Sequence, residues 1–104
     1  MTEELLPRPM VLEEFTPLVG KAIRVDCAPK SVDITLMEAT ALADRGAAPR
    51  PPFILIFHSD PKVRLVSGTY ALRSGSFGPA LVYLEDVVPP MNALPGHYYQ
   101  AVFN

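Results

Sequence analysis

Phe53-Ile-Leu-Ile-Phe57 is the stretch that most directly indicates the fold, because its apolar residues follow one another without a polar break. Pro51-Pro52 precedes it and Asp60-Pro61 follows it. A short apolar run between turn-forming residues is typical of a strand that is covered on both faces. We therefore expect a central strand here, and expect it to anchor the core.

Similar runs, rich in Val, Ile, Leu, Tyr and Phe, occupy most of the remaining chain and are separated by Pro and Gly. Short strands at such spacing are typical of an antiparallel all-β domain. The sequence predicts a six-stranded β-sandwich or a small barrel, and leaves the choice between the two open. The expected strands are Gly20–Asp26, Ser31–Glu38, Phe53–His58, Leu65–Arg73, Ala80–Val88 and His97–Phe103.

The chain has 104 residues, which is the usual size of one domain. We expect a single β domain over 1–104, with an extended arm at 1–9, a short helix at 10–18 and the strands within 20–104. In the helix, Val11, Phe15 and Leu18 recur at helical spacing. A helix of this length is unstable alone, so we expect it to lie as a lid on a sheet or a barrel mouth.

Charge and composition exclude several classes of partner. The chain carries 9 basic and 11 acidic residues, for a net charge of −2, so no basic surface is expected to bind nucleic acid. Every apolar run is too short to cross a membrane, and the first residues do not resemble a signal peptide. Cys27 is the one cysteine, which favours a reducing compartment and a cytoplasmic location.

The residue types of a hydrolase triad occur together in His58-Ser59-Asp60. Neighbouring residues of a strand project to opposite faces, so this tripeptide cannot act as a triad. His97 is the other histidine, and two histidines without clustered carboxylates or thiols do not predict a zinc site. We therefore predict no enzyme activity and no catalytic, metal or cofactor site, unless His58, Asp60 and His97 meet in one cleft.

Aromatic residues suggest a ligand site instead. Tyr70, Tyr83, Tyr99 and Phe57 could line a cavity for a small apolar ligand, with the hydroxyls as polar contacts. Against this, a small barrel is normally filled by its own side chains. Ligand binding is therefore the alternative prediction. The residues proposed for a ligand or an interface are Phe57, His58, Tyr70, Tyr83, His97 and Tyr99.

The first prediction is a non-enzymatic interaction or structural module. An open antiparallel sheet leaves unpaired backbone groups along its edge strands, and these invite another chain to add a strand. The stretch His97–Asn104 carries no formal acid or base that would discourage such pairing. We expect it to be an edge strand through which the protein binds a protein partner or forms a homo-oligomer.

Four segments of the chain are Phe15-Thr-Pro-Leu-Val-Gly20, Pro52-Phe-Ile-Leu-Ile-Phe57, Gly68-Thr-Tyr-Ala-Leu72 and Tyr99-Gln-Ala-Val-Phe-Asn104. Together, in this order and spacing, they resemble a family of small bacterial proteins classed as a domain of unknown function. The likeness covers almost the whole chain and brings no established activity, cofactor or catalytic residue. It implies that the protein is a small component of a bacterial or phage-tail-like assembly.

Overall fold

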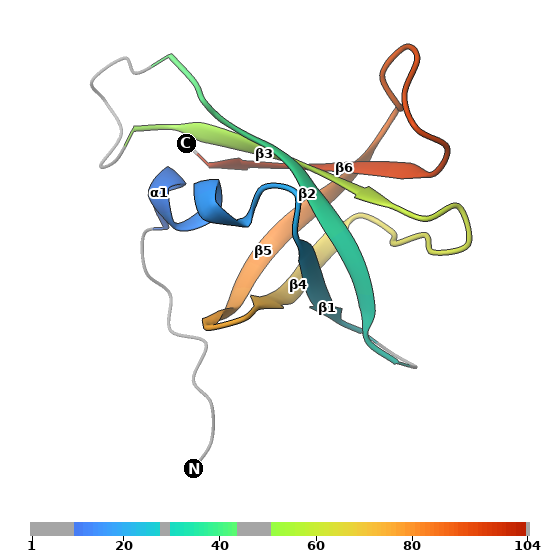
Figure 1. Ribbon diagram of the computed structural model, residues 1–104, viewed down its shortest axis with the longest axis horizontal. Coiled ribbons are helices and arrows are strands. Elements are labelled where there is room, and N and C mark those ends of the chain that lie inside the picture. Colours follow the sequence, from blue (N-terminus) through green and yellow to red (C-terminus); the bar gives the residue numbers. More distant parts are fainter. Residues whose placement is uncertain (1–9, 28–29, 44–50, 104) are drawn as a thin grey trace.

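The computed structural model describes residues 10–27, 30–43 and 51–103 and forms a closed antiparallel barrel (Figure 1). The order of strands around the barrel is β1-β2-β3-β6-β5-β4. The prediction of an all-β, six-stranded fold is confirmed, and the barrel is the form that it takes. The strands are β1 (Ala22–Asp26), β2 (Val32–Ala41), β3 (Phe53–Ser59), β4 (Gly68–Ser74), β5 (Phe77–Val87) and β6 (His97–Phe103).

β3 is central, as its apolar sequence predicts. It pairs with β2 over Phe53–His58 on one side and with β6 over its whole length on the other. Its alternate residues Phe53, Leu55 and Phe57 are buried in the barrel, whereas Ile54 and Ile56 on the outer face are half-buried. The expectation of full cover on both faces is therefore wrong for the outer face, because a barrel covers one face of each strand and leaves the other toward solvent.

The barrel interior is filled by inward side chains from all six strands, as is usual for a barrel of this size. Tyr99 and Phe57 lie opposite each other on β6 and β3 and are both buried. Two further buried residues, Phe15 and Leu65, come from outside the strands. The core consists of Phe15, Ile23, Val25, Ile34, Leu36, Phe53, Leu55, Phe57, Leu65, Leu72, Val82, Leu84, Tyr99 and Ala101.

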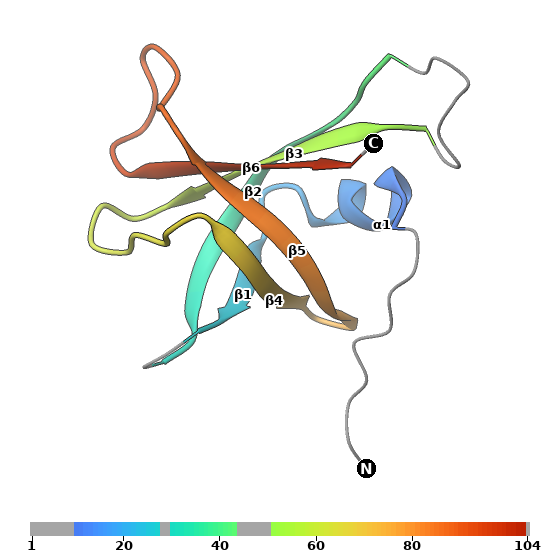
Figure 2. The ribbon, with the colours of Figure 1, turned by 180° about the vertical axis from the view of Figure 1, so that it is seen from behind.

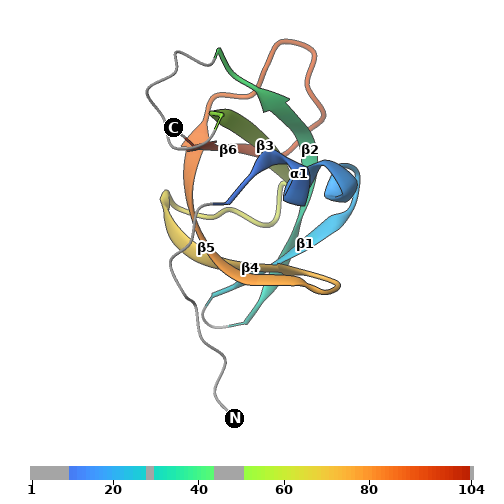
Figure 3. The same ribbon diagram turned by 90° about the vertical axis from the view of Figure 1, so that its left-hand side faces the viewer.

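A short helix, α1 (Leu12–Phe15), continues into a 3₁₀ turn, η1 (Thr16–Leu18), and lies at one end of the barrel (Figure 3). The Glu14 carboxylate accepts a hydrogen bond from the Val11 N–H at 2.8 Å, which fixes the start of the helix. Phe15 points into the barrel end, with ring centroids 5.1–5.8 Å from Phe53, Phe77 and Phe103. The predicted lid is thus confirmed, and the arm at 1–9 lies outside the described residues.

The bounds of β1 to β5 differ from the predicted ones by one to three residues, and two of these differences have a clear structural reason. Leu65–Ser67 precede β4 instead of beginning it, because Leu65 turns inward and closes the second end of the barrel. β5 begins at Phe77, because the turn to β4 is a two-residue hairpin at Gly75-Ser76. Gly75 has φ +58°, the left-handed conformation that such a turn requires and that glycine adopts without strain.

The prediction that β6 is an edge strand is wrong. β6 pairs with β3 along its length, and its residues Tyr98–Gln100 also pair with β5. In an open sheet β6 could have had one neighbouring strand, but in the closed barrel it has two. Asn104, the last residue of the predicted edge, lies outside the described residues.

Candidate functional site

Two loops lie side by side at the end of the barrel opposite α1 (Figure 1). The first connects β3 to β4 over residues 60–67, and the second connects β5 to β6 over residues 88–96. A hydrogen bond joins the His97 Nε2 to the Pro61 carbonyl at 3.2 Å, and the Asp86 N–H donates to the Ser67 hydroxyl at 2.9 Å. Both hydrogen bonds connect the first loop to the end of β5 or the start of β6, between which the second loop runs.

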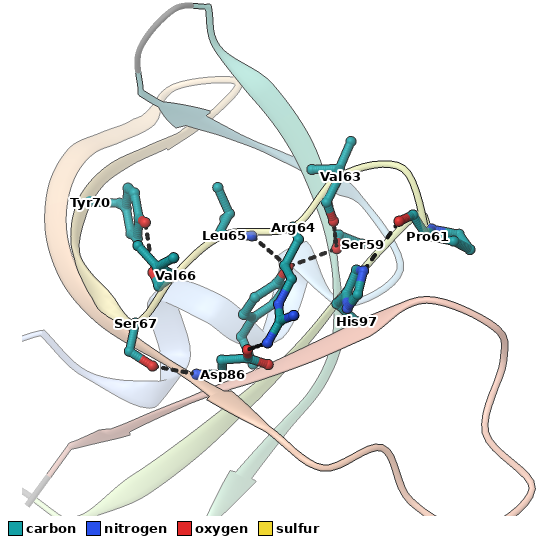
Figure 4. Close-up of polar contacts among 11 residues, drawn as sticks. Ser59, Pro61, Val63, Arg64, Leu65, Val66, Ser67, Tyr70, Asp86 and His97 are labelled. Carbon is teal, nitrogen blue, oxygen red and sulfur yellow. Dashed lines mark hydrogen bonds and ion pairs between the residues drawn. The ribbon is translucent and has the colours of Figure 1, made fainter.

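The first loop is bound to the barrel interior by a chain of hydrogen bonds around Tyr99. Figure 4 labels Ser59, Val63 and Leu65, which belong to this chain. The Leu65 N–H donates to the Tyr99 hydroxyl at 3.0 Å, and the Ser59 hydroxyl donates to the Val63 carbonyl at 2.6 Å. Tyr99 and Ser59 are 2.9 Å apart, so Tyr99 must be the donor between them. Every hydroxyl proton in this buried chain has an acceptor, which explains why Ser59 is tolerated in the core.

Further contacts hold the outer part of the same loop. Arg64 forms an ion pair with Asp86 at 2.9 Å, and the Tyr70 hydroxyl donates to the Val66 carbonyl at 2.6 Å. Burial raises the pKa of Tyr70, because the phenolate would be less well solvated there than the neutral hydroxyl. The loop is therefore held at several points along its length.

The second loop is held against the outer face of β3 and β6. The His58 Nε2 donates to the Pro95 carbonyl at 2.8 Å, and its ring packs edge-on against Tyr98 with centroids 5.0 Å apart. The Tyr98 hydroxyl accepts a hydrogen bond from the Leu94 N–H at 3.1 Å. Gly96 has φ +133°, and a Cβ atom there would lie 2.1 Å from the Ser59 carbonyl oxygen. The base of the loop is thus closely packed.

The tip of the second loop presents apolar side chains to solvent. Val88 is 89% exposed and Met91 is 92% exposed, and Leu94 is also exposed. Val66, in the first loop, is 73% exposed. We call the two loops with these four residues the loop-end surface. Apolar side chains that gather at exposed loops can mark a surface that contacts another molecule.

A hollow of about 320 Å³ lies between the two loops. One side of it is charged or polar, and the other side is apolar. Arg64 and Asp86 already pair with each other there, so the hollow is not a strongly charged site. The residues that line it are Arg64, Asp86, Val87, Val88, Pro89 and His97.

The four residues of the predicted ligand cavity do not share a cavity. Phe57 and Tyr99 are packed in the core, and Tyr99 has its hydroxyl in the buried hydrogen-bond chain. Tyr83 lies on the outer face of β5 and is 57% exposed, whereas Tyr70 is half-buried and bonded to Val66. A ligand at Phe57 and Tyr99 would have to displace core side chains.

The residues considered for catalysis bind to different backbone groups. His58 contacts the Pro95 carbonyl and His97 contacts the Pro61 carbonyl. Asp60 accepts a hydrogen bond from the Lys62 N–H at 2.9 Å and so stabilises its own turn. Over 10–27, 30–43 and 51–103, no group of three His, Cys, Asp or Glu side chains is placed to hold a metal ion.

Ion pairs also lie on the outer face of β1 and its neighbours. Arg73 binds Asp26 at 2.8 Å, and Arg24 binds Asp33 at 3.0 Å. The hydrogen bond from Arg73 lowers the pKa of Asp26, and its charge and that of Arg24 act in the same direction. Arg24 and Arg73 lie opposite each other on β1 and β4, where like charges repel. The two ion pairs offset this repulsion.

Replacing Gly96 by alanine tests whether the second loop is held as described. We expect Gly96→Ala to lower the free energy of unfolding by about 2 kcal/mol or more, from backbone strain together with the collision with Ser59. Gly20→Ala is the matched control, because Gly20 also has positive φ but has open space around it. Urea denaturation of both variants gives the comparison. Equal losses in the two would contradict the close packing at Gly96.

Sequence reasoning missed Val88, Met91 and Leu94. The proline-rich stretch Pro89–Gly96 indicated a loop, whereas Val88 was expected to end the strand before it. Nothing in the sequence distinguished apolar side chains that fold back onto the sheet from those that point outward. The hydrogen bonds from His58 to the Pro95 carbonyl and from the Leu94 N–H to the Tyr98 hydroxyl hold the base of the loop, and the first of them joins residues 37 positions apart in the chain.

Comparison with known proteins identifies the family but assigns no activity. A search of curated proteins and a search of solved structures found no match. Across the described parts of the chain, no helix is long and apolar enough to cross a membrane. The model of one family, described as a domain of unknown function, DUF6916, matches residues 10–103, from the residues before the lid helix to the end of β6. The chain therefore belongs to the DUF6916 family.

Proposed function

We propose that this protein is a non-enzymatic interaction module that binds a protein partner through the loop-end surface. The observation that carries the proposal is the loop 88–96, whose base is firmly held while Val88 and Met91 are almost fully exposed. A loop held in one conformation loses little conformational entropy on binding, so its apolar side chains can contribute their full burial energy.

The shape of the loop tip supports this role. The Ala93 N–H donates to the Pro90 carbonyl at 3.2 Å, which closes a turn with Met91 and Asn92 at its centre. Asn92 has φ 61°, a conformation that asparagine tolerates better than most residues. Methionine is flexible and polarisable and is common at protein-binding surfaces. Met91 is therefore the expected centre of the contact.

The partner is expected to be a protein with a complementary apolar patch. The hollow beside Val88 and Pro89 offers a place for one of its side chains. A component of a bacterial or phage-tail-like assembly, as the family resemblance implies, would use such a surface to bind the next component. A small apolar ligand is the less favoured alternative, because Phe57 and Tyr99 occupy the space that it would need.

Site-specific photo-crosslinking in cells that naturally make the protein tests the proposal. A photo-reactive residue at position 91 is expected to give a discrete protein adduct that mass spectrometry identifies. Position 21 is the matched control, because Lys21 is exposed near the opposite end of the barrel. The adduct should disappear in a Val88→Glu background, which changes an exposed side chain and should alter stability by no more than about 0.5 kcal/mol. Identical adducts from positions 91 and 21, or none from 91, would contradict the proposal.

A further inference from the structure

Met91 is the most exposed sulfur-containing residue in the part of the chain that the structure describes. It is 92% exposed, in the loop 88–96, which projects beyond the strands and away from α1 (Figure 2). Met37, on β2, is 38% exposed, and Met10 is partly buried against the core. Cys27 is half-buried. Because the oxidation of sulfur in a protein follows its access to solvent, Met91 is the methionine most open to an oxidant.

The loop holds Met91 in this exposed position. The turn at the loop tip is closed by the hydrogen bond from the Ala93 N–H to the Pro90 carbonyl, and Met91 lies at its centre. A side chain that is almost fully exposed makes little contact with the barrel, so a change in its chemistry need not disturb the fold. Met10 differs, because its oxidation would place a polar group against the core.

We propose that Met91 is an oxidisable switch: its oxidation to the sulfoxide in the unbound protein prevents the loop-end surface from binding its partner. The oxidant is a peroxide. In the reaction the O–O bond of hydrogen peroxide breaks, an S–O bond forms, and water leaves, so the sulfur loses two electrons and the peroxide gains them. A thiol-dependent reductase reverses the step and yields the thioether, a disulfide and water. The proposal rests on the proposed function, since it requires that this surface binds a protein.

The chemical change acts at the centre of the apolar surface. Met91 is flanked in the same loop by Val88 and Leu94, which are 89% and 57% exposed. Burying the thioether against an apolar patch is favourable, because it removes apolar area from water. The sulfoxide oxygen is instead a strong acceptor that is bonded to water, and burying it without a donor costs free energy. Oxidation therefore removes an attraction and adds a penalty at one position.

Peptide mapping by mass spectrometry, after the folded protein is exposed to hydrogen peroxide, tests the site. We expect the sulfoxide to form at least about twofold faster at Met91 than at Met37, in line with exposed fractions of 92% and 38%, and most slowly at Met10. The midpoint of urea denaturation should be unchanged when Met91 alone is oxidised. Faster oxidation at Met37 or Met10, or a lower midpoint, would contradict the assignment.

Photo-crosslinking tests the effect on binding. Purified protein with a photo-reactive residue at position 94 is oxidised with hydrogen peroxide, freed of the peroxide and added to a lysate of cells that naturally make the protein, so that the partner itself is not oxidised. The protein adduct that the unoxidised chain gives should be lost after oxidation. Treatment with a methionine sulfoxide reductase should restore it, which a loss caused by oxidation of Cys27 would not allow.

Two leucine variants identify the methionine that is responsible. Met37→Leu is the matched control, because it removes a methionine outside the loop-end surface, and its adduct should be lost on oxidation as in the wild-type protein. Whatever amount of adduct Met91→Leu gives, peroxide should not change it, since leucine has no sulfur to oxidise. A loss that Met37→Leu prevents would overturn the switch, and so would a loss that Met91→Leu still shows.

The outcomes also separate the switch from the function on which it rests. If the unoxidised protein gives an adduct that persists when Met91 is fully oxidised, the switch is wrong and the loop-end surface remains the binding site. If the unoxidised protein gives no adduct from position 94, and none from position 91 in cells, the binding function is wrong and the switch with it.

Discussion

Replacing Phe15 by alanine is expected to lower the free energy of unfolding by about 3–5 kcal/mol, a large part of the stability of a domain of this size. Phe15 is 1% exposed, and its ring lies against Phe53, Phe77 and Phe103. Removing it leaves a cavity at the barrel end, and the rings around it cannot collapse into the space without moving β3, β5 and β6.

Urea denaturation followed by circular dichroism measures this effect. Val19→Ala is the matched control, because Val19 follows the same helical segment but is exposed, and it should change stability by no more than about 0.5 kcal/mol. Phe15→Leu, which keeps most of the volume, should cost less than about 1.5 kcal/mol and remains measurable if the alanine variant does not fold. A loss below about 1 kcal/mol for Phe15→Ala would show that the lid is not part of the core.

Replacing Tyr99 by phenylalanine is expected to cost about 2–4 kcal/mol, although the ring stays in place. The Leu65 N–H loses its acceptor and the Ser59 hydroxyl loses a donor, and each buried polar group left unpaired costs about 1–3 kcal/mol. Tyr83→Phe is the control, because it removes a hydroxyl from an exposed ring and should be nearly neutral.

The effect of Tyr99→Phe should also be visible in the loop. The Leu65 amide is expected to exchange with solvent faster in this variant, since its hydrogen bond to the hydroxyl is gone. A double-mutant cycle with Ser59→Ala should give a coupling energy of about 0.5–3 kcal/mol. Additive losses, together with unchanged exchange at Leu65, would contradict the hydrogen-bond chain.

The strands could be predicted because they depend on local patterns. The apolar run at Phe53–Phe57 and the alternation of Ile23 and Val25 with Arg24 and Asp26 are properties of neighbouring residues. The closure of the barrel was not predictable in this way. It depends on pairs such as Glu85 with Gln100, whose partners have no local signature. For that reason an edge was expected at β6, whereas this strand has a neighbouring strand on both sides.

Less of the candidate site than of the fold could be predicted from the sequence. The predicted residues His58, His97 and Tyr99 do lie close to the site, but they support its loops through hydrogen bonds to Pro95, Pro61 and Leu65. In each of these three hydrogen bonds, the two residues are more than thirty positions apart in the sequence. A residue type can indicate that a polar group needs a partner, but it cannot identify a partner so far along the chain.

The β4–β5 hairpin is attached to the rest of the barrel by two short ladders. β4 meets β1 over Arg24–Asp26, and β5 meets β6 over Glu85–Val87, whereas β3 is paired on both sides over Phe53–His58. Local opening requires the least free energy where the fewest pairs must break. We therefore expect the hairpin to detach from the barrel at a lower free-energy cost than β3, so its amides should exchange with solvent faster than those of β3.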